Sequence, residues 1–82
     1  MAAKYSSPFL RELARRLKAI RQERHLTLQE VYNATGIHVS RIESSGLNVT
    51  LLTLAKLCQY YQVQLTSIVE GLESLLEESS VS

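Results

Sequence analysis

The sequence predicts an all-α fold, a compact domain of five short helices. Apolar residues recur at spacings of three and four along most of the chain, which places them on one face of a helix. Ser, Thr and Pro residues precede these stripes, as helix N-termini favour, and no strand-like alternation extends beyond a few residues. The 82 residues suffice for one small domain. We place it at residues 8–76, between an N-terminal arm over 1–7 and a polar tail over 77–82.

The first helix is expected over residues 8–24. Ser7 suits the N-cap, and Pro8 suits the first helical position because proline has a fixed φ and no N–H to leave unpaired. Basic residues are expected to lie off the apolar stripe, and those near residue 24 also suit the helix C-terminus. The stripe consists of Leu10, Leu13, Leu17 and Ile20, and the basic residues beside it are Arg11, Arg15, Lys18 and Arg21.

The second and third helices are predicted from their first residues. Thr27-Leu28-Gln29-Glu30 matches the capping box, in which Glu30 reaches back to the backbone N–H of Thr27. This helix should bury Val31 and end near residues 33–34. Thr35 is then expected to cap the third helix, which buries Val39 and Ile42.

The fourth and fifth helices follow a polar loop over residues 44–48. Thr50 suits the N-cap of the fourth helix, which should end at residues 60–62. The residues of this helix that suit burial are Leu51, Leu54, Ala55, Leu57 and Cys58. The fifth helix is expected to run from Gln64 to about Leu76.

Composition excludes several classes of protein. The lone Cys58 cannot form an intramolecular disulfide or a zinc site, so a reduced, cytoplasmic protein is the default expectation. No apolar run approaches the roughly 20 residues of a membrane span. No HExxH, phosphate-loop, CxxC or paired-carboxylate motif occurs. We therefore expect no enzyme, no cofactor, no metal and no small-molecule ligand.

The charge is unevenly distributed along the chain. Residues 1–24 hold seven basic and two acidic residues, a net +5, whereas the remainder holds two basic and six acidic residues, a net −4. A basic first part permits nucleic-acid binding on one face. A solvated helix with mixed charge explains the same pattern.

Three segments together carry a resemblance to a known family. They read LKAIRQERHLTLQE over 17–30, SRIESSGLNVTLLTLAKL over 40–57 and YYQVQLTSIV over 60–69. In order and spacing they resemble the XRE family, the Cro/CI-like and lambda-repressor-like helix-turn-helix regulators. The resemblance implies that helices two and three form a helix-turn-helix that binds double-stranded DNA, with a homodimer reading two half-sites.

The resemblance also implies roles for individual residues. Asn48 matches a loop asparagine that contacts a phosphate, and Thr35 matches the residue that caps the recognition helix. The helix caps Thr27 and Thr35 are expected to contact phosphates as well. Gln29 lies one residue after the position of a phosphate-anchoring glutamine, here Leu28. The groove-facing part of the third helix would consist of Gly36, Ile37, His38, Ser40 and Arg41.

The chain departs from the family pattern between Thr27 and Thr35. About three residues are missing there, nearly one helical turn. The second helix or its turn should therefore be shortened, and the usual turn glycine is absent unless Gly36 replaces it.

Structural roles are alternatives for the same residues. His38 also suits a cap or the edge of the core, and Arg41 also suits an ion pair with Glu30 or Glu43. The surplus of apolar residues late in the chain predicts a homodimer interface, with extra packing inside one chain as the alternative. The expected interface residues are Tyr60, Leu72, Leu75 and Leu76. A regulator of transcription is the predicted function; the alternative is a protein–protein adaptor, such as an antitoxin-like partner module, that keeps the fold without reading DNA.

Overall fold

The computed structural model describes residues 7–45 and 49–76, and over these residues it is helical throughout, without β-strands. The elements are α1 (Pro8–Glu23), α2 (Leu28–Thr35), α3 (Val39–Ser45), α4 (Leu51–Tyr61), α5 (Leu65–Val69) and the 3-10 helix η2 (Leu72–Leu76). The predicted all-α fold of five helices is confirmed. The predicted arm and tail, apart from Ser7, lie outside the described residues, as do residues 46–48 of the predicted loop. The other two residues predicted for that loop, Ser44 and Ser45, are instead the last two residues of α3, because the helix continues past its buried face.

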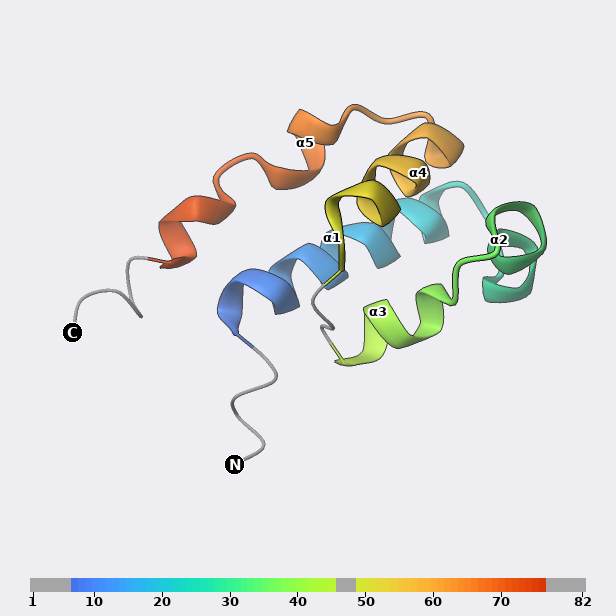
Figure 1. The fold of residues 1–82 in the computed structure, drawn as a ribbon, viewed down its shortest axis with the longest axis horizontal. Helices are drawn as coiled ribbons and strands as arrows, with labels where there is room; N and C mark the ends of the chain where they lie inside the picture. The colour runs from blue at the N-terminus through green and yellow to red at the C-terminus, as the bar shows by residue number, and fades with distance from the viewer. Residues whose placement is uncertain (1–6, 46–48, 77–82) are drawn as a thin grey trace.

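Helix α1 is the support on which the other elements assemble. It contacts α3 along one side and α5 and η2 along another, while α2 packs against α3 and α4 (Figure 1). The helix-turn-helix pair α2–α3 therefore lies at one end and along one side of α1, and the C-terminal elements lie across from it.

The core draws side chains from every helical element. Leu13 and Leu17 of α1 are 3% and 1% exposed, which confirms that part of the predicted stripe. The remaining core members are Val31, Val39, Ile42, Leu54, Leu57, Cys58, Tyr61, Ile68 and Leu72.

Two residues of α4 that were expected to be buried are exposed. Leu51 is the first residue of α4, where the helix extends beyond the core, and it is 70% exposed. Ala55 is also exposed because the buried positions of α4, at 54, 57, 58 and 61, define a face that excludes position 55.

The predicted fifth helix is not continuous. Gly71 has a φ of 79°, a left-handed conformation, and it separates α5 from η2. The prediction of one helix to Leu76 is therefore wrong, because the left-handed conformation of Gly71 interrupts the helix. Leu72, the first residue of η2, is buried in the core and is 1% exposed.

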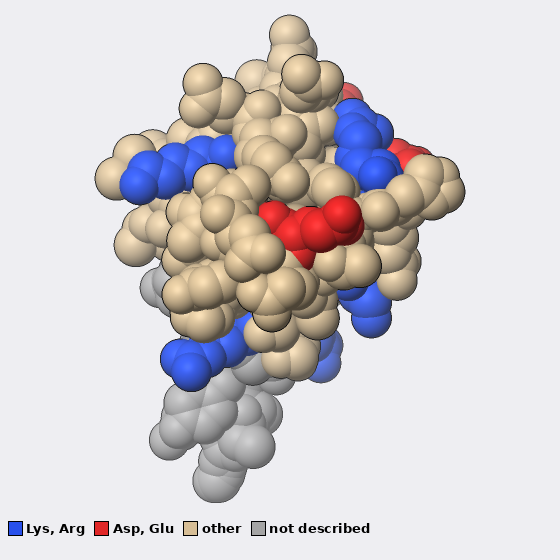
Figure 2. All heavy atoms as spheres, turned by 90° about the vertical axis from the view of Figure 1, so that its right-hand side faces the viewer, with Lys and Arg blue, Asp and Glu red and all other residues tan. Residues whose placement is uncertain are grey.

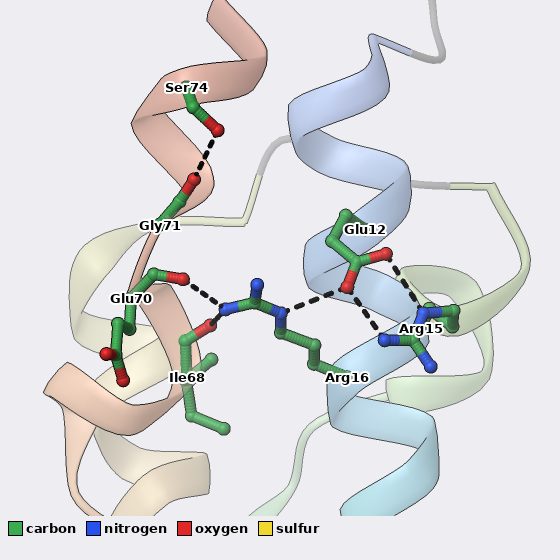
Figure 3. Close-up of polar contacts among 7 residues, drawn as sticks. All are labelled: Glu12, Arg15, Arg16, Ile68, Glu70, Gly71 and Ser74. Atoms are coloured by element: carbon green, nitrogen blue, oxygen red, sulfur yellow. Dashed lines mark hydrogen bonds and ion pairs between the residues drawn. The ribbon is translucent and has the colours of Figure 1, made fainter.

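Arg16 of α1 binds the chain at the bend between α5 and η2. Its Nη1 donates to the carbonyl oxygens of Ile68 and Glu70, each at 2.8 Å, and these are groups that a continuous helix would have paired itself (Figure 3). Its Nε donates to Glu12, which also accepts two hydrogen bonds from Arg15. The hydrogen bonds from Arg15 and Arg16 lower the pKa of Glu12 to about 2. Both arginines therefore have structural partners.

Candidate nucleic-acid interface

Helix α2 begins with the predicted capping box. The Thr27 hydroxyl accepts from the backbone N–H of Glu30 at 3.0 Å, and the Glu30 carboxylate accepts from the backbone N–H of Thr27 at 2.8 Å. These reciprocal bonds satisfy two donors at the helix N-terminus. They also fix the start of α2 at the residue where the sequence placed it.

The end of α2 differs from the prediction. The helix continues through Thr35 and is closed by Gly36, whose φ is 76° and whose N–H donates to the carbonyl of Tyr32 at 2.8 Å. The Thr35 hydroxyl donates to the carbonyl of Val31 at 2.8 Å and accepts from the N–H of Ile37 at 3.1 Å. Thr35 is thus the last residue of α2 and not the cap of α3, because the left-handed conformation needed to end the helix falls on the glycine.

Gly36 is consequently the turn glycine of the helix-turn-helix. Helix α2 has eight residues and α3 has seven. The sequence predicted a shortened second helix or turn; in the structure, α3 is the shorter of the two helices, and the turn between them comprises residues 36–38. Gly36, Ile37 and His38 lie in the turn, and only Ser40 and Arg41 of the expected reading residues lie in α3.

A buried ion pair holds α3 on α1. Arg21 donates from Nε and Nη2 to the two carboxylate oxygens of Glu43, at 2.8 and 2.9 Å, and from Nη1 to the carbonyl of Leu26 at 2.8 Å. Arg21 is 8% exposed. The hydrogen bonds from its guanidinium to Glu43 raise the pKa of Arg21 above its ordinary value. The bidentate geometry fixes α3 and the α1–α2 connection to the same side chain.

One earlier expectation changes with this ion pair. Arg21 was placed beside the apolar stripe, but it lies four residues after Leu17 and therefore continues the buried face of α1. That spacing was the sequence signal for its role. Glu43, one of the two partners considered for Arg41, has both carboxylate oxygens engaged by Arg21.

The outer surface of α2 and the turn carries an aromatic pair that the sequence did not predict. The rings of Tyr32 and His38 stack with centroids 4.3 Å apart and an interplanar angle of 28°. Tyr32 and Leu28 are each 40% exposed. His38 is also exposed and directly precedes α3, so it lies at the N-cap position and not at the edge of the core.

Two open hollows adjoin at this surface. One, of about 330 Å³, is lined by Lys18, Arg21, Leu28, Ser40, Arg41, Glu43 and Ser44. The other, of about 250 Å³, is lined by Leu28, Gln29, Tyr32, His38, Val39 and Ser40. Leu28 and Ser40 line both, so they form the wall that the hollows share.

The end of the molecule that carries α2 is mostly uncharged. Figure 2 shows acidic side chains near its middle and Lys or Arg side chains around its margin. Within residues 27–45 the charged residues are Arg41, Glu30 and Glu43. The basic residues of α1 thus contribute more positive charge than the helix-turn-helix pair itself.

The remaining predicted site residues occupy different environments. Gln29 is exposed and donates from Nε2 to the Asn33 side-chain oxygen at 2.9 Å. Ile37 is half-buried against the core. Asn48 lies outside the described residues.

Of the expected dimer residues, Leu72 belongs to the core of the single chain, because it lies on the same face as the buried Ile68, and at 1% exposure it is not accessible to a partner. Tyr60 and Leu75 are half-buried, and Leu76 is 47% exposed.

The arrangement of α1, α2 and α3 defines a class of protein. Two short helices, joined through a left-handed glycine and clamped to a supporting helix, form a helix-turn-helix domain, the class that binds DNA through its second helix.

The comparison with known families agrees with this class. A family model described as helix-turn-helix matches residues 17–68, more than half of the chain. The chain belongs to the XRE family of Cro/CI-like helix-turn-helix domains and is a DNA-binding regulator. No curated protein and no solved structure matches it. Over residues 7–45 and 49–76, no helix is both long and apolar enough to cross a membrane.

Proposed function

We propose that this protein binds specific sequences in double-stranded DNA as a homodimer and controls transcription by occupying an operator in the cytoplasm of a prokaryotic or phage-infected cell. The observation that carries the proposal is the α2–Gly36–α3 unit, held on α1 by the Arg21–Glu43 ion pair. A recognition helix must keep one orientation to align its side chains with base edges. The bidentate ion pair supplies that orientation.

The residues assigned to contact DNA follow from their positions. Ser40 and Arg41 lie in the first turn of α3, with His38 just before it, and all three are exposed. Arg suits guanine, and His and Ser donate to base edges or phosphates. We assign these three residues to sequence discrimination.

The other predicted contacts take positioning roles. Thr27, Gln29 and Asn48 are assigned to phosphates, and Gly36 to close approach of the backbone. Thr35 and Ile37 hold the turn, since the Thr35 hydroxyl is engaged within it and Ile37 packs partly on the core.

The dimer proposal rests on the C-terminal elements. Leu76 is exposed, Leu75 and Tyr60 are half-buried, and a two-fold contact through these residues would pair the recognition helices. The test is the molar mass in solution, measured by light scattering. We expect twice the chain mass for the wild type and a shift toward the single-chain mass for Leu76→Asp. A wild type of single-chain mass at all accessible concentrations contradicts the dimer.

DNA binding is tested by titrating the protein against random duplex DNA at about 50 and 200 mM salt, because each phosphate contact contributes about −0.9 to the slope of log K against log salt. Several contacts should weaken binding by more than tenfold across this range. Arg41→Ala and His38→Ala should then reduce sequence selectivity, whereas Asn48→Ala should weaken binding to all sequences alike. Absence of binding at the lower salt refutes DNA recognition.

A second function is favoured by one specific observation. Leu51 and Leu52 on α4 are 70% and 66% exposed, and exposed neighbouring leucines are typical of protein-binding surfaces. A protein–protein adaptor of this fold would bind its partner there. Leu51→Ser/Leu52→Ser should leave duplex binding unchanged if the protein acts on DNA alone.

A further inference from the structure

The two adjoining hollows beside α3 differ in chemistry. The larger hollow is basic, because Lys18, Arg21 and Arg41 line it together with a single carboxylate, that of Glu43. Arg21 and Glu43 neutralise each other through their ion pair. The residues that line this hollow therefore carry a net charge of +2, and Lys18 from α1 and Arg41 from α3 lie on two different helices, an arrangement that suits an anion.

The smaller hollow is aromatic and apolar. Tyr32 and His38 present their stacked rings, Leu28 and Val39 add aliphatic surface, and Gln29 and Ser40 supply an amide and a hydroxyl. No Lys, Arg, Asp or Glu lines it among the described residues. Such a lining favours a planar or methyl-bearing group that also offers hydrogen-bonding atoms.

The shared wall places these two chemistries side by side. Leu28 and Ser40 line both hollows, so the hollows adjoin and two neighbouring groups of one ligand fit them together. In DNA, a phosphate and a base edge are the neighbouring groups with these two chemistries. The thymine methyl is the apolar group that a base edge presents in the major groove.

We propose that the two hollows form one contact site for duplex DNA, with a backbone phosphate at Lys18 in the basic hollow, beside the base-reading Arg41, and a thymine methyl against Tyr32 and His38. This inference rests on the proposed function and adds Lys18, Leu28 and Tyr32 to the contact surface. Tyr32 positions His38 through the ring stack and determines specificity through its own exposed ring edge. Tyr32 adds a side chain from α2 to the surface at the start of α3, where its ring contacts His38.

The phosphate contact is tested with Lys18→Gln, and Lys56→Gln is the matched control. Both lysines are exposed and helical, but Lys56 lies on α4 and lines a different hollow. Loss of one phosphate contact should reduce the salt slope by about 0.9, so that the affinity loss between 50 and 200 mM salt shrinks by about threefold to fourfold. The reduction should be the same for every duplex sequence. An unchanged slope in Lys18→Gln, or an equal change in Lys56→Gln, overturns the phosphate assignment.

The methyl contact is tested with a duplex selected from a random pool by the wild type. Replacing each thymine in turn by uracil removes one methyl group, and burial of a methyl is worth about 0.8 kcal/mol, or about fourfold in affinity. One position should show this loss with the wild type and not with Tyr32→Ala. Leu52→Ala, at an exposed apolar position on α4, should keep the wild-type pattern. A methyl effect that persists in Tyr32→Ala, or no methyl effect at any position, overturns the assignment.

The outcomes separate this inference from the proposed function. Salt-dependent duplex binding that is insensitive to Lys18, Tyr32 and the methyl groups leaves the function standing and removes the site. Tighter binding to single-stranded than to duplex DNA also removes it, since the rings would then stack on unpaired bases. Absence of any duplex binding overturns both. Circular dichroism of each variant verifies that the helices are retained.

Discussion

Replacing Glu43 by alanine leaves the guanidinium of Arg21 buried without its carboxylate. The two side chains are only 10% and 7% exposed, and the bonds between them are 2.8 and 2.9 Å long. Removing one partner of a buried ion pair costs about 3–5 kcal/mol. Because domains of this kind are stable by about 5–15 kcal/mol, Glu43→Ala should remove a large part of the free energy of unfolding.

The assay is urea unfolding followed by far-UV circular dichroism. The unfolding midpoint should fall steeply in Glu43→Ala with little change in the urea dependence. Glu23→Ala is the control, because Glu23 is 71% exposed and its contact with Arg24 is 3.8 Å long, so its loss should cost less than about 1 kcal/mol.

A double variant distinguishes the cost of burying an unpaired charge from a general loss of packing at this position. Arg21→Met/Glu43→Leu removes both charges, and buried pairs replaced by apolar residues often keep their stability. It should therefore be more stable than Glu43→Ala. If Glu43→Ala loses no more than Glu23→Ala, the ion pair does not hold α3 on α1, and the reasoning about the orientation of the recognition helix fails.

Three further predictions concern single groups. The pKa of Glu12 is lowered to about 2, so its contribution to stability is present above the ordinary value of 4.5 and is lost as the pH falls toward 2. The difference in urea midpoint between wild type and Glu12→Gln should vanish over that range. Gly36→Ala places a Cβ in the left-handed conformation at φ 76° and should destabilise the fold by about 1–2 kcal/mol, measured by the same unfolding assay. The Tyr61 hydroxyl is buried without a hydrogen-bond partner among the described residues, and burial raises the pKa of Tyr61 to about 12. Tyr61→Phe should therefore leave stability unchanged or increase it, and should remove the part of the wild-type stability that is lost as the pH rises from 10 to 12.

The sequence predicted the features that depend on neighbouring residues. The capping box of Thr27 and Glu30 is local, because both bonds join residues three apart, and it forms as expected. The apolar stripe of α1 follows from helical spacing, because Leu13 and Leu17 lie four residues apart and therefore on one face of the helix, and both are buried.

The incorrect predictions concern residues whose local sequence fits two different conformations. Thr35 suits either a helix cap or the end of a helix, and only the left-handed conformation of Gly36 decides between them. Gly71 decides in the same way that the C-terminal segment bends. The spacing from Leu17 places Arg21 on the buried face, but its partner Glu43 lies 22 positions away, and the Tyr32–His38 stack depends on the geometry of the turn. Neither the partner of Arg21 nor the stack follows from composition or periodicity.

The hydrogen bonds of Arg16 have a consequence for the order of folding. Its acceptors, the carbonyls of Ile68 and Glu70, lie 52 and 54 residues further along the chain. Closing so long a loop is entropically costly until the intervening helices have condensed. We therefore expect α5 and η2 to dock on α1 late, after the helix-turn-helix has assembled, and destabilisation of this contact to appear mainly as faster unfolding.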